Sequence, residues 1–426
     1  MAKAYILYRE RRAEVRRLKA SIGVHDDLKL TVNAVKVLER RYLLRDEEGN
    51  IVETPRQIFR RVAHAIASAE RKFDANADVQ ALKEKFFAMM GSLRFLPNTP
   101  TLMNAGANLG QLAACSVLAV GDSIREIFDA LKNMALIHQS GGGAGFSFSH
   151  LRPKGDMVRS TKGVASGPVS FMKVFDAATD AMKQGGKRRG ANMGILSVDH
   201  PDIVEFVLAK SNASTLSNFN ISVGASDGFV EAVLWKQDWP LINPRTGRQT
   251  GSIKANELFD LIVNNAWQTG DPGLVFLDEI NRRNPTPHIG NIEATNPCGE
   301  LLLLPYESCN LGSINLGRFV INGEVQWNDL QQIVSDGVHF LDNVIEANVF
   351  PLPEIESITR QGNRKAGLGV MGFADALIKL GIACDSESAL ETGEQIIRFI
   401  AKEAQGASVR LARAPRRLPQ FQGQYL

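Results

Sequence analysis

Cysteine is scarce in this sequence, and the few cysteines present are widely spaced. There are four among 426 residues, and no two of them form a C-x-x-C pair. Small secreted proteins that depend on disulfides are much richer in cysteine, so a disulfide framework is excluded. The seven histidines show neither H-x-x-x-H nor H-E-x-x-H spacing, which argues against a zinc site. The cysteines that remain to be explained as core residues, nucleophiles or redox centres are Cys115, Cys298, Cys309 and Cys384.

A strong net charge and long apolar segments are also missing. The formal net charge is +3, which is too small to favour nucleic acid or an anionic membrane as a partner. No apolar run reaches the ~18 residues that a membrane-spanning helix needs. The N-terminal stretch "MAKAYILYRERRAEVRR" mixes Glu with Arg and has no apolar signal core. We therefore expect a cytoplasmic protein without DNA or membrane partners.

The apolar residues predict helices first and an α/β arrangement afterwards. "TPRQIFRRVAHAIASAERKF" has helical spacing, with Thr54 placed as N-cap and Pro55 in the first turn. From Phe95 onward, short strand-like stretches alternate with helices, which is typical of parallel α/β folds. The sequence therefore predicts an α/β fold with an N-terminal helical domain over residues 1–95 and a second domain over residues 96–426.

The stretch "ATNPCGE" is the first candidate for a reactive site. Pro297 and Gly299 bracket Cys298, which excludes a regular helix or strand and favours a tight loop. Asn296 and Glu300 lie two residues to either side, so a locally extended turn would let all three side chains face one way. That arrangement would offer a thiol, a carboxylate for proton transfer and an amide to orient a hydroxyl. The competing interpretation is a Pro-Gly turn with an incidental cysteine.

Two kinds of cysteine chemistry remain open at this stage. A hydrolytic nucleophile would need a histidine base, and although His288 is near in sequence, nothing marks it as a partner. A redox role needs thiols that meet. Cys115 and Cys309 both fall on predicted strands, which can be neighbours in a sheet although they are distant in sequence. The residues alone do not show that they are.

Three further stretches have ligand-binding composition. The glycines of "SGGGAGFSFSHLRPKG" allow close backbone approach to a ligand, although the pattern is neither a Rossmann nor a P-loop fingerprint. "KQGGKRRGAN" combines four cations with three glycines and fits a phosphate contact or a solvated basic turn. "FLPNTPTLMNAG" fits a polar ligand loop or a connector.

Taken together, these stretches resemble the large catalytic subunit of ribonucleotide reductases, with wording most similar to the adenosylcobalamin-dependent class II enzymes. The resemblance covers nearly the whole chain, from about residue 28, and its most specific part is N-x-C-x-E followed by C-N-L-G-S-I-N-L. The strings that carry it are "LPNTPTLMNAG", "CSVL", "SGGGAGFSFSHLRPKG", "TKGVASGP", "KQGGKRRGANM", "NFNISV", "ATNPCGE" and "LPYESCNLGSINL".

The resemblance implies a fold and a set of catalytic roles. It implies a ten-stranded α/β barrel with a central finger loop, which carries Cys298 as the thiyl radical site that removes the 3′ hydrogen of a ribonucleotide. Glu300 would take the 3′-hydroxyl proton, and Asn296 would hold the substrate. Cys115 and Cys309 would reduce the 2′ carbon as water leaves, ending as a disulfide. Cys384 matches no cysteine of the family and is expected in the core.

The same resemblance implies nucleotide sites and partners. Effector deoxynucleotides or ATP would select the substrate base, and a thioredoxin- or glutaredoxin-like protein would reduce the disulfide. Adenosylcobalamin is implied by resemblance alone, since no D-x-H-x-x-G cobalt-ligand motif is present. A homodimer is a further expected assembly. The implied substrate residues are Thr99, Thr101, Ala114 and Gly143, and the implied effector residues are Asp122, Arg159, Lys183 and Arg188.

The sequence departs from the family in lacking the P-T-G-T run that binds substrate phosphate and a C-terminal cysteine pair. We therefore expect an incomplete barrel without its C-terminal strands, low activity of this chain alone, and a complementing C-terminal polypeptide. Two alternatives stay open: a class I large subunit that receives its radical from a separate subunit, and an inactive nucleotide-binding fragment. Glu300 argues against the class III glycyl-radical relatives.

Overall fold

The structure is a computed structural model that describes residues 28–113, 115–158, 162–182, 190–212 and 214–413, together with residues 13, 15, 17, 19 and 26. Within these residues the helices are α2 (Val32–Arg41), α3 (Pro55–Ser68), η1 (Ala69–Lys72), α4 (Val79–Gly91), α5 (Thr99–Asn104), α6 (Ile124–Gln139), α7 (Pro168–Met182), α8 (Ile203–Val207), α9 (Asp227–Leu234), α10 (Ala255–Thr269), α11 (Leu277–Arg282), η2 (Leu316–Arg318), α12 (Trp327–Ala347), α13 (Pro353–Ile358), η3 (Thr359–Asn363), α14 (Phe373–Leu380) and α15 (Glu387–Arg413).

One sheet organises the molecule, in the order β1-β13-β2-β3-β6-β7-β10, with β16 paired to the other edge of β13. Four short two-stranded pairs complete the described strands. The strands are β1 (Phe95–Pro97), β2 (Cys115–Leu118), β3 (Gly143–Ser147), β4 (Met157–Val158), β5 (Gly163–Val164), β6 (Asn192–Ser197), β7 (Phe219–Ala225), β8 (Asp238–Ile242), β9 (Gln249–Lys254), β10 (Gly273–Phe276), β11 (Ala294–Thr295), β12 (Leu302–Leu303), β13 (Ser308–Asn315), β14 (Val320–Ile321), β15 (Glu324–Val325) and β16 (Ala366–Met371).

The sheet has a parallel part and an antiparallel junction. Strands β2, β3, β6, β7 and β10 run parallel to their neighbours, as the alternation of strands and helices predicts. Strand β13 runs antiparallel to β2 and parallel to β16, so the direction of the sheet reverses between β2 and β13. The predicted α/β class is confirmed, and the curled sheet has eight strands in the part of the chain that is described.

The two faces of the parallel strands are covered differently. Helices α6 to α10 cover one face, on which Ala144 and Phe146 of β3 join a large buried cluster. The hairpin of β11 and β12 covers the other face, where Val117, Met193 and Ile195 pack against Ala294 and Leu303. Burial on both faces explains why these strands are almost continuously apolar.

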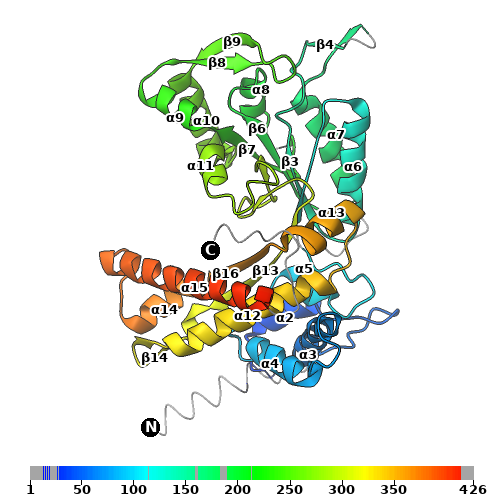
Figure 1. Cartoon of the computed structure of the whole chain (residues 1–426), viewed down its shortest axis with the longest axis vertical. Coiled ribbons are helices and arrows are strands. Elements are labelled where there is room, and N and C mark those ends of the chain that lie inside the picture. Colours follow the sequence, from blue (N-terminus) through cyan, green and yellow to red (C-terminus); the bar gives the residue numbers. More distant parts are fainter. Residues whose placement is uncertain are drawn as a thin grey trace.

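A second lobe is built from helices that are far apart in the sequence. Helices α2, α3 and α4 lie beside α12 and α15 in the lower half of Figure 1. Phe86 and Phe95 meet Phe340 of α12 edge to face in the centre of this lobe. The sequence correctly predicts the start of α3, because Thr54 caps the helix and Pro55 is its first residue. The domain boundary expected after residue 95 stays a prediction.

Two local predictions from the sequence are wrong. In "HPDIVEFVLAKS", Pro201 predicts the start of a helix, but α8 begins at Ile203, after a turn, with Asp202 as N-cap. The apolar residues of "GLVFLDEI" predict one strand, but the stretch divides into β10 and α11 at Leu277. Short apolar runs do not distinguish a buried strand from the first turn of a helix.

Strand β13 joins the helical lobe to the sheet, and Gly312 sits at the tightest point of that junction. A Cβ on Gly312 would lie 2.3 Å from the ring of Phe95, which is fully buried. We predict that Gly312→Ala lowers stability by about 1–3 kcal/mol, because the ring cannot retreat without strain. Thermal unfolding would measure the loss of stability. The control is Gly369→Ala on the neighbouring strand β16, where an added Cβ makes only ordinary van der Waals contacts. Equal melting temperatures for the two variants would contradict the prediction.

Candidate active site

The hairpin between β11 and β12, residues 294–303, presents Cys298 at its tip and is called the finger hairpin below. Ala294 pairs with Leu303, and two hydrogen bonds between Asn296 and Leu301 close the loop. The Asn296 amide donates to the Leu301 carbonyl at 3.2 Å, and the Leu301 amide donates to Asn296 Oδ1 at 3.0 Å. Gly299 has φ +81°, the left-handed conformation that lets the chain turn back. The predicted tight loop is therefore present.

Two glycines of β3 allow the finger hairpin to lie directly on the sheet. A Cβ on Gly145 would lie 1.8 Å from the Thr295 carbonyl oxygen, and a Cβ on Gly143 would lie 2.7 Å from the Pro297 ring. The sequence interpretation assigned this glycine run to close approach of a ligand. In the structure, the backbone that approaches is that of the protein's own hairpin. Asn220 of β7 adds a further anchor, because its Nδ2 donates to the Pro297 carbonyl at 2.7 Å.

The three predicted residues of the loop differ in exposure. Cys298 and Glu300 are exposed, whereas Asn296 is fully buried. The Asn296 Nδ2 donates to Cys115 Sγ at 3.7 Å, so this side chain points below the loop and not outward with the other two. The expectation that all three face one way is wrong, because the Asn296 side chain closes the loop itself.

Cys115 and Cys309 lie opposite each other on β2 and β13. Directly opposed residues of antiparallel strands have Cα atoms roughly 4.5–5.5 Å apart, which falls inside the range that disulfides span. Both side chains are buried, at 6% and 2% exposed. Burial raises the pKa of Cys309 well above its usual range, and Cys115, Glu300 and Glu307 raise it further. The Cys309 side chain therefore stays a protonated thiol at neutral pH.

Polar side chains fix the two strands that carry these cysteines. Ser308 Oγ donates to the Cys115 carbonyl at 2.9 Å, and the Ser308 amide donates to Thr359 Oγ1 at 3.1 Å. The buried carboxylate of Glu307 accepts from Lys365 at 2.8 Å and from the Leu304 amide at 2.7 Å. The turn before β13 is thus tied to η3 and β16 as firmly as to β2.

Of the predicted substrate residues, Gly143 is paired with Cys115 across β2 and β3, whereas Thr99 and Thr101 belong to α5. Thr101 is fully buried, and its Oγ1 donates to the Leu112 carbonyl at 3.2 Å. Thr99 is within 3.0 Å of the Tyr42 hydroxyl. Gly143 touches Pro297 of the finger hairpin, as described above. Ala114 lies outside the described residues.

Of the predicted effector residues, only Asp122 is described. Its carboxylate accepts from the Arg152 amide at 2.9 Å and from Arg152 Nε at 2.8 Å, so it holds the turn after β3. The others lie outside the described residues: Arg159, Lys183 and Arg188. Cys384 was expected in the core but is exposed, because it falls in the turn between α14 and α15.

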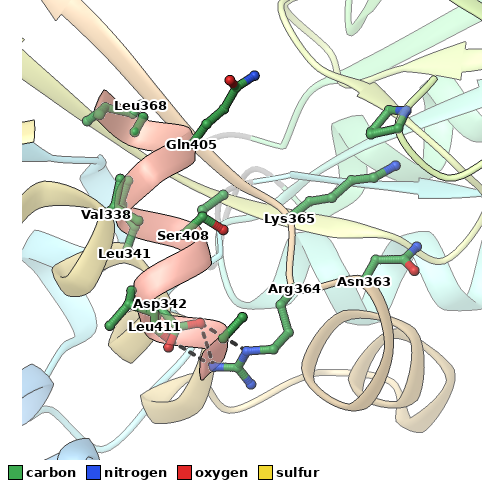
Figure 2. A pocket seen from close by; sticks show the side chains of 14 residues that line it. Val338, Leu341, Asp342, Asn363, Arg364, Lys365, Leu368, Gln405, Ser408 and Leu411 are labelled. Atoms are coloured by element: carbon green, nitrogen blue, oxygen red, sulfur yellow. Dashed lines mark hydrogen bonds and ion pairs between the residues drawn. The ribbon is translucent and has the colours of Figure 1, made fainter. Parts of the chain in front are cut away.

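Two cavities border the site without containing Cys298. One, of about 270 Å³, lies at the ends of β2 and β3 and is lined by His150 and Glu293. His150 Nε2 lies 2.6 Å from Glu293 Oε2, and the hydrogen bond that the imidazole donates to this carboxylate raises the pKa of His150. The other, of about 440 Å³, lies between α12, β16 and α15 (Figure 2), with Arg364 paired to Asp342.

The sequence interpretation missed several residues that build the site. Asn220 stands within "NFNISV", a string that carries the family resemblance, and this was the available signal for it. Glu307 likewise stands within "LPYESCNLGSINL". Thr359 and Lys365 had no local signal, because each acts through a contact with a distant segment. The described residues contain no group of three or more His, Cys, Asp or Glu side chains suited to a metal ion. In the same part of the chain, every helix is too short or too polar to cross a membrane.

Comparison with known families agrees with this arrangement. The family model "Ribonucleotide reductase, barrel domain" matches residues 113–426, and "Ribonucleotide reductase, all-alpha domain" matches residues 28–110. The chain belongs to the ribonucleotide reductase large-subunit family. The predicted resemblance is therefore confirmed at the level of the family.

Curated relatives show how much of a ribonucleotide reductase large chain is present. The "Vitamin B12-dependent ribonucleoside-diphosphate reductase" of Thermoplasma acidophilum is 53% identical over 468 residues, covering 97% of this chain and 61% of the relative. The protein of the same name from Mycobacterium tuberculosis (strain H37Rv) is 49% identical over 422 residues, covering 99% and 60%. The "Ribonucleoside-diphosphate reductase subunit alpha" of Chlamydia trachomatis is 30% identical, covering 93% and 40%. The chain thus spans about three fifths of the length of the B12-dependent relatives.

The contact between Gly145 and Thr295 leads to a prediction about the finger hairpin. We predict that Gly145→Ala lifts the hairpin from β3, because the added Cβ meets a backbone oxygen that cannot rotate away. The free energy of unfolding should fall by about 1–3 kcal/mol or more. Amide hydrogen exchange of the peptide that contains Asn296 and Leu301 should become faster. Gly251→Ala on β9, where the nearest atom would be 3.9 Å from the Cβ, is the control. An unchanged rate of amide hydrogen exchange in Gly145→Ala would contradict the prediction that this contact holds the hairpin on β3.

His138, at the end of α6, makes the stability of the fold depend on pH. A Cβ on Gly190 would lie 2.6 Å from its ring, and burial lowers the pKa of His138 to about 4. Since the unfolded pKa is near 6.5, the unfolded state binds more protons between pH 6.5 and 4. The stability present above pH 6.5 is therefore lost as the pH falls through that window. We predict a loss of about 2 kcal/mol from pH 7 to pH 5 that is absent in His138→Gln. An equal loss of unfolding free energy between pH 7 and pH 5 in the two proteins would contradict this prediction.

Proposed function

We propose that this chain is the catalytic part of an adenosylcobalamin-dependent ribonucleotide reductase that acts on ribonucleoside diphosphates. The observation that supports this most is the placing of three cysteines. Cys298 is exposed at the tip of an anchored hairpin, while Cys115 and Cys309 face each other on adjacent strands and Asn296 connects the loop to Cys115. A hydrolytic cysteine is disfavoured, because Cys115, which accepts from Asn296, and Cys309 opposite it form a pair suited to two-electron reduction.

The side chains would share the work as follows. A thiyl radical at Cys298 removes the hydrogen atom from C3′ of the ribose, and the Glu300 carboxylate takes the proton of the 3′-hydroxyl. The 2′-hydroxyl leaves as water while Cys115 and Cys309 together give up two electrons and two protons, forming a disulfide. Cys298 returns the hydrogen to C3′. The sum is a ribonucleotide and a dithiol giving a deoxyribonucleotide, a disulfide and water.

The protonation and position of the dithiol suit this role. Burial keeps Cys309 a thiol, so it holds the hydrogen that the reduction needs. Asn296 was expected to hold the substrate. Because its amide donates to Cys115 and its carbonyl oxygen accepts from Leu301, we propose that it positions Cys115 and the loop. Glu300 remains exposed beside Cys298 for the proton transfer.

The cofactor proposal rests on the names of the relatives and on one feature of the structure. Two relatives at 49–53% identity are named as vitamin B12-dependent. The exposure of Cys298 and Glu300 fits a large cofactor, because both side chains can be reached from outside the chain. When bound, adenosylcobalamin would supply the unpaired electron that Cys298 requires. Every other step uses the chain's own side chains.

Several partners follow from the proposed reaction. A ribonucleoside diphosphate would be the substrate, and a deoxynucleotide or ATP effector would act near Asp122, Arg159, Lys183 and Arg188. The disulfide would need a thioredoxin- or glutaredoxin-like reductant. A homodimer and a complementing C-terminal polypeptide are proposed assemblies. Such a polypeptide would approach the segment from Arg364 to Leu368, which leads into β16 and lines the larger cavity in Figure 2.

The test is deoxynucleotide formation from CDP with a dNTP effector, dithiothreitol and adenosylcobalamin. It would use the 426-residue chain alone and with the C-terminal region of a B12-dependent relative. We predict that product depends on the cofactor, that Cys298→Ser abolishes it, and that Glu300→Gln lowers the rate about 10²–10⁴-fold. Cys384→Ser, exposed and outside the site, is the matched control and should keep full activity. Product that requires an added radical-generating subunit instead of adenosylcobalamin would favour a class I large subunit, and product from Cys298→Ser would overturn the proposed mechanism.

A further inference from the structure

A small cavity lies behind Cys309, between β13 and the end of α12. Its volume is about 10 Å³, which is the space that one water molecule needs. Cys309, Asn310, Asn348, Thr359 and Phe350 are among its lining residues. Both asparagines are 2% exposed. The finger hairpin lies on a different side of β2 and β13 and contributes nothing to this lining.

The hydrogen bonds of both asparagines fix which way their amide groups point. Asn348 Oδ1 accepts from the Leu112 amide at 2.6 Å and from the Ala113 amide at 3.3 Å. Asn310 Nδ2 donates to the Leu341 carbonyl at 2.6 Å. Flipping either group would place two donors or two acceptors against each other, so the orientation of each follows from its partners.

Each asparagine keeps one buried polar atom without a hydrogen-bond partner among the described residues. For Asn310 it is the acceptor Oδ1, and for Asn348 it is the donor Nδ2. Buried polar groups in folded proteins are almost always satisfied by protein or by an ordered water. One unpartnered acceptor and one unpartnered donor, on two residues that line a cavity of one-water size, are the complement of a single water molecule.

We propose that this cavity binds one ordered water, and that Asn310 and Asn348 position the dithiol through it. The water donates to Asn310 Oδ1 and accepts from Asn348 Nδ2. Asn348 holds the backbone of Leu112 and Ala113, which leads into Cys115. Asn310 directly follows Cys309. The bridge therefore connects the two chain segments on which Cys115 and Cys309 stand, and it does so from the side opposite the finger hairpin.

The consequence concerns the redox equilibrium of the pair, and to that extent the inference rests on the proposed function. Disulfide formation between two cysteines depends on how closely the protein holds the sulfurs. Loss of the bridge frees the segment before Cys115 from β13 and lowers the effective concentration of one thiol at the other. The disulfide then becomes less stable relative to the dithiol. Neither asparagine touches the substrate in this role, so both are positioning residues.

The first test is direct observation of the water. A crystal structure of the unmodified chain at a resolution that shows ordered water should contain one molecule within hydrogen-bond distance of Asn310 Oδ1 and Asn348 Nδ2. A dry cavity, or amide groups rotated so that they satisfy each other, would overturn the proposal.

The second test is the redox equilibrium of the pair, measured without nucleotide or cofactor. The purified chain is equilibrated in dithiothreitol buffers, alkylated, and the Cys115 and Cys309 peptides are quantified by mass spectrometry. Asn310→Ala and Asn348→Ala should each lower the equilibrium constant for the disulfide about tenfold, which corresponds to a shift of about 30 mV.

The matched control is Asn343→Ala, one turn earlier on α12. Asn343 is also fully buried and also has an unpartnered Oδ1 among the described residues, but it faces Ile66 of the helical lobe. It should lower the melting temperature and leave the equilibrium unchanged. An equal shift in Asn343→Ala, or no shift in the other two variants, would overturn the positioning role. Because no turnover is measured, a failed reductase assay would leave this result standing.

Discussion

The close contact between β3 and the finger hairpin is the constraint on which the site depends. Gly143 and Gly145 leave the first part of the inner face of β3 without side chains, so that the Pro297 ring and the Thr295 carbonyl can rest on the backbone. Atoms in a protein interior are close-packed, so even a small shift at this contact would require the neighbouring atoms to move as well. The contact therefore fixes the distance between the finger hairpin and the sheet. That distance in turn determines how far Cys298 lies from the strands that carry the other cysteines.

The site separates two kinds of thiol by environment. Cys298 stands exposed on a loop tip, where a reactive group can meet a large molecule. Cys115 and Cys309 are buried on opposed strands, and burial raises the pKa of Cys309. Under the proposed mechanism, thiols of nearly identical intrinsic chemistry would receive different roles through burial, because the charged form of a thiol is costly in an apolar surrounding. Asn296 spans the two environments from the base of the loop.

Short-range features of the fold were predictable from the sequence, and long-range contacts were not. Thr54 and Pro55 mark the start of α3, and Pro297 with Gly299 marks the finger loop, because caps and turns are decided by adjacent residues. The antiparallel register that sets Cys309 opposite Cys115 has no local signal. Asn348 reaches Ala113 across 235 positions of sequence. The glycines of β3 were noticed, but composition could not tell a ligand from the chain's own hairpin.

The position of the dithiol also depends on the helical lobe, through β13. The first residues of β13 pair with β2, and its later residues pair with β1 on that edge and with β16 on the other. Phe95 of β1 is fixed in turn by Phe340 of α12. A displacement of α12 would therefore move β13 at two points, at Gly312 through Phe95 and at Asn310 through its hydrogen bond to Leu341. The helices thus set the position of Cys309 although none of them carries a cysteine of the proposed mechanism.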